Sequence, residues 1–486
     1  MSPHPSATAA RPIRSEPTAP PAAGDGARFR RRAAAVLLVS AQFVVMLDTS
    51  IVNVALPSIQ RDLALAPDML AWIVNTYVLA FGALLLLGGR VADTVGRRTM
   101  FILGAGLFTL GSLVAGTATS EAALIAGRLV QGTGAAALSP AAMALLLVTF
   151  PGTHRARAMS AWGAASTLGG ATGVVVGGLL AGSLGWSSVF FATVPLTAAA
   201  ALLARRLLPS THGSGVARRF DVAGSATITA AVLALSYAAL SLPEHGWASA
   251  HVLGAAAVTV VLVLLFVRVE RSAPDPLVPL ELFRSRVLSA GVAVAVLGGA
   301  ARASTFVLIA LFLQQALLLA PAAAGFAMLP TSLAGLAVSV LVLPRVLRRI
   351  GAERSMVLGL VVLALGHLSL MRIPAADLVY VRDVLPALLL VATGVALSFT
   401  PTTMVIAAAL PAHRTGLASG LAGSSTQIGA SVGLAAFTAV ALSAAQDAQA
   451  QVSTISSAGF SAAFLAAAAV ALSTAGATLV LLVRRS

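Results

Sequence analysis

The chain has 486 residues, of which 58% are hydrophobic and only 10% are charged, and its mean hydropathy is +0.95. This apolar share is far above that of soluble domains, so the composition excludes a soluble globular protein and predicts a polytopic membrane protein. The chain contains no cysteine, which excludes disulfides, thiolate catalysis and cysteine-bound metals.

Residues 1–33 are rich in Pro, Ala and Arg and lack apolar periodicity, so we expect a disordered cytoplasmic tail. The apolar run that follows is too long for the core of a signal peptide, and no cleavage is expected. Because a membrane-spanning helix needs about 20 mainly apolar residues, the rest of the chain predicts fourteen spans. They lie near 34–57, 69–89, 99–118, 121–149, 159–182, 187–207, 222–242, 250–269, 287–317, 322–343, 354–372, 384–409, 416–443 and 459–483.

The distribution of arginine predicts the topology. An even number of spans places both termini on one side, and 26 of the 31 basic residues fall on that side. The positive-inside rule therefore places both termini in the cytoplasm of a cell whose plasma membrane holds the protein. The net charge of +15 follows from this topology, so we expect no nucleic-acid partner.

The first span contains "LDTSIVNVALPSI", residues 47–59, and Asp48 is the only carboxylate that we place well inside a span. Ionisable residues inside the membrane are costly and indicate function by default. Burial penalises the charged form of a carboxyl group, so Asp48 could take up a proton on one side and release it on the other. The alternative is a structural hydrogen bond or an ion pair with an arginine.

The turn after the second span reads "GGRVADTVGRRTM", residues 88–100. A phosphate-binding loop would need GxxxxGK[ST] between a strand and a helix. The chain contains no lysine and membrane spans flank the turn, so ATP-driven transport is excluded. Glycines such as Gly89 and Gly96 allow backbones to approach closely, and Asp93 can meet a helix N-terminus or an arginine. A merely basic turn would not need this aspartate, which favours a switch.

Two later spans carry further signals. Arg128 begins "RLVQGTGAAALSP", residues 128–140, and an arginine at that depth needs a partner or a water-filled cavity. We expect Arg128 to pair electrostatically with Asp48 rather than to serve only as an anchor. In the fifth span, Gly169, Gly173 and Gly177 recur every four residues and predict a face for close helix packing.

The chain contains an internal repeat. The turn at 88–100 has a weaker echo in "LPRVLRRIGAERSM", residues 343–356, and "HRARAMSAWGAASTLGGA" at 154–171 matches "HRTGLASGLAGSSTQIGA" at 413–430. The two spacings are 255 and 259 residues. The repeat predicts two six-helix bundles, which is a common design of secondary transporters. The expected units are an N-terminal bundle at 34–207, a linker with two extra spans at 208–282, and a C-terminal bundle at 283–486.

The turn resembles the signature G-x-L-a-D-r-x-G-r-k/r, which lies between spans 2 and 3 of the major facilitator superfamily. In that family the aspartate and arginines latch the two bundles together in the outward-facing state. In the echo Arg348 stands where Asp93 stands, so the resemblance implies a one-sided latch. The implied gating residues are Gly89, Arg90, Asp93, Gly96, Arg97 and Arg98.

Three spans resemble the fourteen-span drug:proton antiporter branch of the same superfamily. Span 1 is similar to LDxTVVNVALP, span 4 to R-x-x-q-G-x-g-a, and span 5 to G-x-x-x-G-P-x-x-G-G. In span 5 Val174 replaces the proline, which puts the kink that this proline would supply in doubt. The matching residues are Asp48, Asn53 and Pro57 in span 1, Arg128, Gln131, Gly132 and Gly134 in span 4, and Gly169, Gly173, Gly177 and Gly178 in span 5.

Polar residues within spans are candidates for a substrate cavity. Arg302 lies mid-span in the second bundle, where no carboxylate accompanies it, so such a cavity would suit neutral or anionic substrates better than dications. For Asn75, His367 and Gln427 an interhelical hydrogen bond is the alternative. The cavity candidates are Asn53, Asn75, Tyr77, Gln131, Arg302 and Gln427.

The expected fold is an all-α polytopic membrane protein with the major facilitator fold, two six-helix bundles plus two inserted linker helices. The expected function is proton-coupled export of hydrophobic drugs or antibiotics by alternating access. Asp48 would carry the proton and Arg128 would tune it, in a monomer without metal or cofactor. An importer, or an organic-anion exporter that uses Arg302, is the alternative. An intramembrane enzyme would need a nucleophile–base pair or a metal motif such as HExxH, which is absent.

Overall fold

A computed structural model describes residues 25–65, 67–151, 153–210, 221–246, 248–319, 321–372, 379–446 and 457–483. Thirteen helical segments in these ranges are long and apolar enough to cross a membrane. One of them, Ala323–Met371, has 49 residues and would measure about 74 Å as one helix, whereas the hydrocarbon core is about 30 Å thick. Its backbone leaves helical geometry at Gly351, with φ 80° and ψ 175°, so this segment crosses twice. The described ranges therefore hold fourteen crossings, which confirms the predicted fold.

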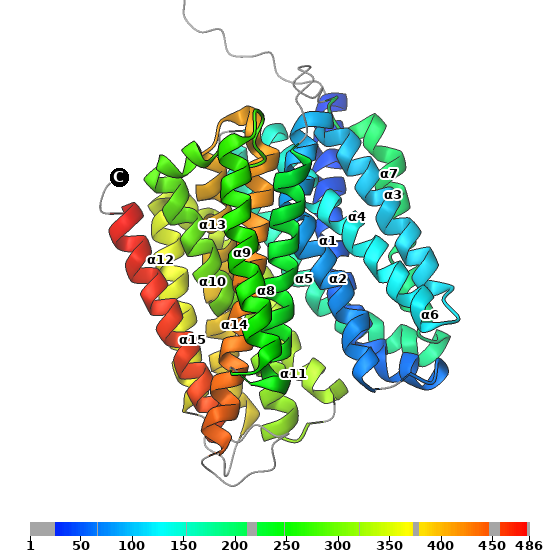
Figure 1. Ribbon diagram of the computed structural model, residues 1–486, viewed down its shortest axis with the longest axis vertical. Helices are drawn as coiled ribbons and strands as arrows, with labels where there is room; N and C mark the ends of the chain where they lie inside the picture. The colour runs from blue at the N-terminus through cyan, green and yellow to red at the C-terminus, as the bar shows by residue number, and fades with distance from the viewer. Residues whose placement is uncertain are drawn as a thin grey trace, which may run out of the picture.

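The first six crossings form one bundle (Figure 1). Helix α1 packs along α5, and α4 packs against both α2 and α3. The sixth crossing consists of two helices, α6 and α7, that follow each other closely. The helices are α1 (Asp25–Asp62), α2 (Pro67–Val95), α3 (Arg97–Gly116), α4 (Glu121–Thr149), α5 (Thr153–Leu184), α6 (Ser187–Phe191) and α7 (Val194–Leu207).

The last six crossings form the second bundle, in which α12 packs against α13 and α15, and α10 against α14. Short π-helical segments follow α10, α11 and α15 and precede α13, and 3-10 turns precede α10 and α14. The α-helices are α10 (Arg286–Leu311), α11 (Pro321–Ala337), α12 (Leu343–Met371), α13 (Leu385–Ala408), α14 (Thr415–Gln446) and α15 (Ser457–Thr478). The short segments are η1 (Leu280–Arg284), η2 (Phe312–Ala316), η3 (Val338–Val342), η4 (Tyr380–Val384), η5 (Ala412–Arg414) and η6 (Leu479–Val483).

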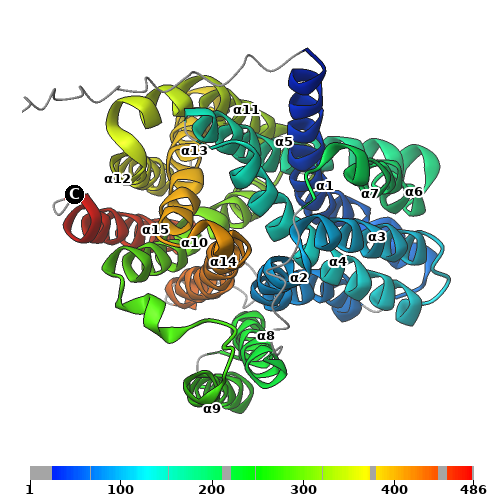
Figure 2. The same ribbon diagram turned by 90° about the horizontal axis from the view of Figure 1, so that it is seen from above.

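The two extra crossings, α8 (Val222–His245) and α9 (Ala250–Ser272), pair as a hairpin outside both bundles. Helix α8 packs against α14 and α2, so the hairpin lies beside the seam between the bundles (Figure 2). Much of α9 is exposed and apolar, including Val261 and Leu264, as expected of a helix that faces lipid.

The repeat is visible in how the helices pack. A side chain at Gly104 or Gly111 of α3 would collide with the backbone of α4. Gly359 and Gly366, 255 residues later, meet the backbone of α13 in the same way. Without a hydrophobic force between helices in lipid, such close backbone contacts supply the packing energy, and both bundles use the same ones.

The predicted tail needs one correction. Helix α1 begins at Asp25 rather than at residue 34, because residues 25–33 contain no proline and are rich in Ala and Arg, which favour a helix. Residues 1–24 of the tail lie outside the described residues.

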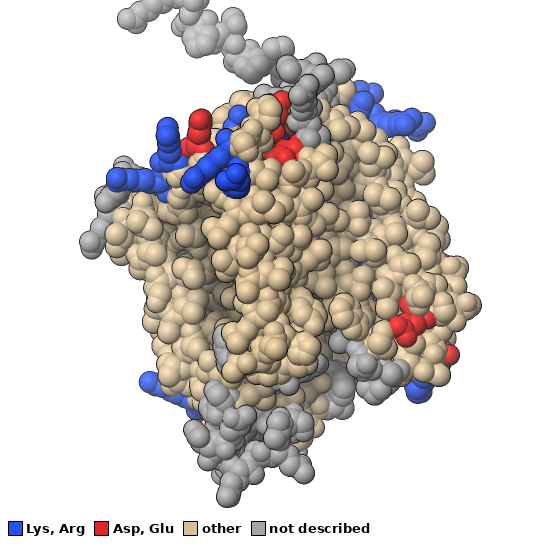
Figure 3. Space-filling view, viewed as in Figure 1, with Lys and Arg blue, Asp and Glu red and all other residues tan. Residues whose placement is uncertain are grey.

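Charged side chains mark the two ends of the molecule. Figure 3 shows arginines gathered mainly at the end where α1 begins and α15 finishes, and an uncharged band across the middle of this face. Exposed examples at this end include Arg206 of α7 and Arg354 of α12. We call this the basic end.

Candidate functional site

Asp48 and Arg128 form an ion pair inside the first bundle. The Arg128 Nη1 atom of α4 donates to the Asp48 Oδ2 atom of α1 at 2.6 Å, and the two side chains are 1% and 0% exposed. Arg128 also donates through Nε to the carbonyl oxygen of Ile73 at 3.1 Å. Its guanidinium lies 4.3 Å from the centre of the Tyr77 ring. The structure thus brings together the two ionisable residues that the sequence predicted would interact.

Gln131 completes the polar cluster. Its Nε2 atom donates to Asp48 Oδ1 at 3.0 Å and to Ser112 Oγ at 2.8 Å, and its Oε1 atom accepts from Arg128 Nη1 at 3.0 Å. Each carboxylate oxygen of Asp48 therefore has a donor. Removing one partner of a buried ion pair typically costs about 3–5 kcal/mol. Arg128 also contacts Gln131, Ile73 and Tyr77, so the cluster holds both charged side chains in a fixed arrangement.

Asp93 joins the two bundles at the basic end. Its carboxylate accepts from the backbone N–H groups of Gly416 at 2.9 Å and Leu417 at 2.8 Å, in the first turn of α14. It also accepts from Arg97 Nε at 3.1 Å and Nη2 at 3.0 Å. The first N–H groups of a helix have no partner inside the helix and carry a partial positive charge. Asp93 of α2 thus caps a helix of the opposite bundle.

Close backbone contact accompanies this cap. A side chain at Gly89 of α2 would collide with the carbonyl oxygen of Gly416 and with the backbone of Gly420. Gly96, which directly precedes α3, has φ 109°, a conformation that favours glycine. At Gly89 the backbones of α2 and α14 therefore meet directly.

The second seam at the basic end is apolar. Leu343 and Leu347 of α12 cluster with Leu397 of α13 and with Ala156 of α5. Arg348, which stands in the repeat where Asp93 stands, is exposed. Apolar packing thus joins the bundles at this seam, where the repeat offers no second carboxylate.

The segment after α9 is hydrogen-bonded to α2 at the basic end. Arg90 Nη2 donates to the carbonyl oxygen of Pro276 at 3.1 Å, and both carboxylate oxygens of Glu270 accept from the N–H of Val278 at 3.3 Å. Arg98 Nη1 donates to the carbonyl oxygen of Leu208 at 3.4 Å. Glu270 is not among the residues predicted from the sequence, although an acidic residue near the end of so apolar a helix is a signal.

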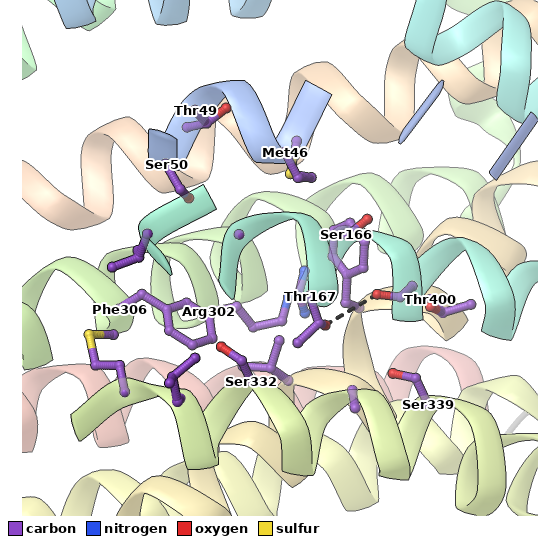
Figure 4. A pocket seen from close by; sticks show the side chains of 18 of the residues that line it. Met46, Thr49, Ser50, Ser166, Thr167, Arg302, Phe306, Ser332, Ser339 and Thr400 are labelled. Carbon is purple, nitrogen blue, oxygen red and sulfur yellow. Dashed lines mark hydrogen bonds between the residues drawn. The ribbon is translucent and has the colours of Figure 1, made fainter. Parts of the chain in front are cut away.

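A cavity of about 410 Å³ lies between the bundles. Helices α1 and α5 line it from one side, and α10, α11, α13 and α14 from the other. Figure 4 shows Arg302 of α10 between α5, which carries Thr167, and α11, which carries Ser332. The other side chains of the lining are apolar or carry hydroxyl groups. The cavity could hold a molecule of drug size.

Comparison with known proteins identifies the fold family. The model of the Major Facilitator Superfamily matches residues 38–434. The chain belongs to the major facilitator superfamily. Among solved structures, the human organic anion transporter MFSD10 shares 16% identity, covers 92% of this chain and 99% of its own, and has a TM-score of 0.65. At this identity the likeness supports the fold alone.

Curated relatives place this superfamily member in the drug efflux branch. The cephamycin export protein CmcT of Amycolatopsis lactamdurans is 37% identical over 407 residues, 83% of each chain. The puromycin resistance protein of Streptomyces alboniger is 37% identical over 427 residues, 87% of this chain and 84% of its own. The tetracenomycin C resistance and export protein of Streptomyces glaucescens is 32% identical over 395 residues, 81% and 72% of the two chains. They confirm the predicted family and a transporter rather than an enzyme.

Among the predicted cavity residues of this transporter, Arg302 lines the cavity described above. Gln131 and Tyr77 are fully buried in the cluster around Arg128. Asn53 is exposed and donates to the carbonyl oxygen of Thr49 in its own helix. Polarity within a span does not specify which side of a helix faces the cavity.

Asn75 and Gln427 are half-buried and are not among the residues that line this cavity. The Gln427 side chain lies at the α2–α14 seam, where a side chain at Gly82 would come within 2.8 Å of its Cγ. Its neighbour Thr426 reaches the cavity instead.

The glycines of α5 differ in their packing. A side chain at Gly169, Gly173 or Gly177 would press on α1 at distances under 3 Å, whereas at Gly178 the nearest atom is 3.8 Å away, an ordinary contact. Val174, which replaces the motif proline, lines the cavity, and α5 continues through it as one helix.

Proposed function

We propose that this protein exports hydrophobic drugs or antibiotics across the plasma membrane in exchange for protons. The observation that carries this proposal is the position of Asp48 on α1. Asp48 faces Arg128 of α4, while its neighbours Met46, Thr49 and Ser50 line the cavity. One short stretch of α1 thus contacts both the proton site and the substrate site.

Coupling follows from this shared stretch. Protonation of Asp48 removes its charge and weakens the electrostatic attraction between Arg128 and α1. Binding of a substrate presses on the opposite side of the same helix turn. Two ligands that act on one movable element are coupled by the free energy of its displacement, so substrate binding and proton binding exclude one another, as exchange requires.

Gating is assigned to the basic end, which we place in the cytoplasm together with both termini because of its arginines. The cap of Asp93 on α14 and the apolar contact of α12 with α5 hold this end closed. On this proposal the cavity is sealed from the cytoplasm in the conformation described. Transport requires that both contacts open, and a monomer contains everything needed for this.

The substrate class rests on the relatives, which are named for cephamycin, puromycin and tetracenomycin C, and on a cavity that is largely apolar with hydroxyl groups. Each of these relatives covers more than 80% of this chain. Such similarity supports a shared transport cycle.

The proposal is tested in a drug-sensitive bacterium that lacks its own efflux pumps. Cells that express the wild type should export at least one drug of a panel that includes a cephamycin, puromycin and tetracenomycin C, and a proton uncoupler should stop this export. Asp48→Asn should abolish uncoupler-sensitive export, whereas the control Asp62→Asn, at the exposed end of the same helix, should not. Export by Asp48→Asn at the wild-type rate and with the same sensitivity would contradict the proposal.

A further inference from the structure

Arg302 occupies in the second bundle the place that Asp48 occupies in the first. The sequence FRRR from Phe29 recurs as FRSR from Phe283, 254 residues later, and the same spacing carries Asp48 onto Arg302. Both residues are buried on the first helix of their bundle, at 0% and 2% exposure. The two halves of the transporter therefore hold opposite charges at equivalent positions.

The two charges differ in their surroundings. Asp48 is satisfied by Arg128 and Gln131, whereas Nε, Nη1 and Nη2 of Arg302 have no hydrogen-bond partner among the described residues. Ser112 belongs to the cluster around Asp48, and the residue 255 positions later is His367. The Nε2 atom of His367 lies 2.6 Å from Thr305 Oγ1, so His367 contacts Thr305 instead of Arg302.

The fold nevertheless keeps the guanidinium in place. It lies over Gly298, one turn earlier in α10, where a side chain would come within 3.0 Å of its Cζ atom. The ring of Phe399 is 6.0 Å from it. An unpaired buried charge is strongly unfavourable, and the described residues that line the cavity include no aspartate or glutamate. Among the described residues that line the cavity, none supplies a counterion for this guanidinium.

We propose that the cavity takes substrates that carry an anionic oxygen group, a carboxylate or a similar oxyanion, and that Arg302 is its counterion. A guanidinium binds such a group with two parallel hydrogen bonds. Ser332 and Thr167, whose hydroxyl donates to the Gly163 carbonyl oxygen at 3.2 Å, line the cavity beside Arg302, and Phe306 and Met328 offer contacts for an apolar body. This inference names the substrate class of the proposed export site and rests on that function only for the direction of transport.

Binding of a matched pair of probes tests the inference without any gradient. The full chain in lipid nanodiscs is titrated with 1-pyrenebutyrate and with its methyl ester, which shares the apolar body but lacks the charge. Hydrogen bonds between charged partners contribute about 1.5–3 kcal/mol, so the wild type should bind the acid about 10- to 100-fold more tightly than the ester. Arg302→Met should remove this preference, and Arg302→Lys should retain part of it.

A second readout separates this role from a structural one. The substrate-free Arg302→Met protein should unfold at a temperature equal to or above that of the wild type, because an unpaired buried charge has been removed. Equal binding of acid and ester, failure of both to bind, or a preference that survives in Arg302→Met would each overturn the inference. If the wild type shows no proton-driven export in cells but still prefers the acid in nanodiscs, the proposed function alone is refuted.

Discussion

Replacement of Asp93 by asparagine should open the basic end of the transporter. In the wild type the carboxylate accepts from Gly416 and Leu417 of the opposite bundle and from Arg97 of its own. An asparagine keeps the shape but has one acceptor oxygen, and its NH₂ group must then face another donor. The contact with Arg97 lies within one bundle and can persist in both states, so the two bonds to α14 set the size of the effect.

The magnitude follows from those two bonds. A hydrogen bond to a charged group contributes about 1.5–3 kcal/mol, and a carboxylate at a helix N-terminus gains about 0.3–1 kcal/mol, up to about 2 when partly buried. Allowing for the one bond that the amide oxygen can still accept, the closed state should lose about 2–3 kcal/mol. This corresponds to a shift of about 30- to 150-fold in the equilibrium between closed and open basic ends.

Distances between spin labels measure this shift. The chain lacks cysteine, so Arg206→Cys and Arg354→Cys, exposed at the basic end on opposite bundles, place labels without further changes. Asp93→Asn should move the distance distribution toward longer values. The control Thr94→Val, which loses only hydrogen bonds within α2, should not. An unchanged distribution in Asp93→Asn would refute the role of this cap.

Three further substitutions test the packing by the midpoint of unfolding in detergent. Arg128→Met should destabilise the protein by about 3–5 kcal/mol because it strands Asp48, and the double variant with Asp48→Asn should recover much of that loss; additive losses would contradict the pairing. Gly173→Ala should cost about 1–3 kcal/mol by overpacking against α1, whereas equal effects of Gly173→Ala and Gly178→Ala would rule out the proposed face. Gly351→Ala should cost about 1–2 kcal/mol because its φ is 80°, and a neutral result would show that the turn can relax.

The spans could be predicted because hydropathy is a local property of a sequence. The repeat could be predicted because two similar stretches can be compared at any separation. The pairing of Asp48 with Arg128 could also be proposed, since two opposite charges at membrane depth need each other. The role of Gln131 could not, because nothing local distinguishes a residue that faces a neighbouring helix from one that faces a cavity.

The cap of Asp93 on α14 illustrates the same limit at larger scale. Its residues were recognised from the turn, but its partner is the first turn of α14, more than 320 residues away. The hydrogen bond from Arg90 to the Pro276 carbonyl oxygen likewise depends on how the segment after α9 packs against α2. Such contacts follow from how the bundles dock, which side-chain patterns within one helix do not encode.

Transport by purified protein in liposomes tests proton coupling through Asp48 most directly. Liposomes that contain the wild type, a pH-sensitive dye and the drug with the largest efflux in cells receive an imposed proton gradient. The wild type should move the drug against its concentration gradient while protons flow the other way, and Asp48→Asn should only let the drug equilibrate. Uphill drug movement by Asp48→Asn, or wild-type transport that ignores the proton gradient, would contradict the proposed mechanism.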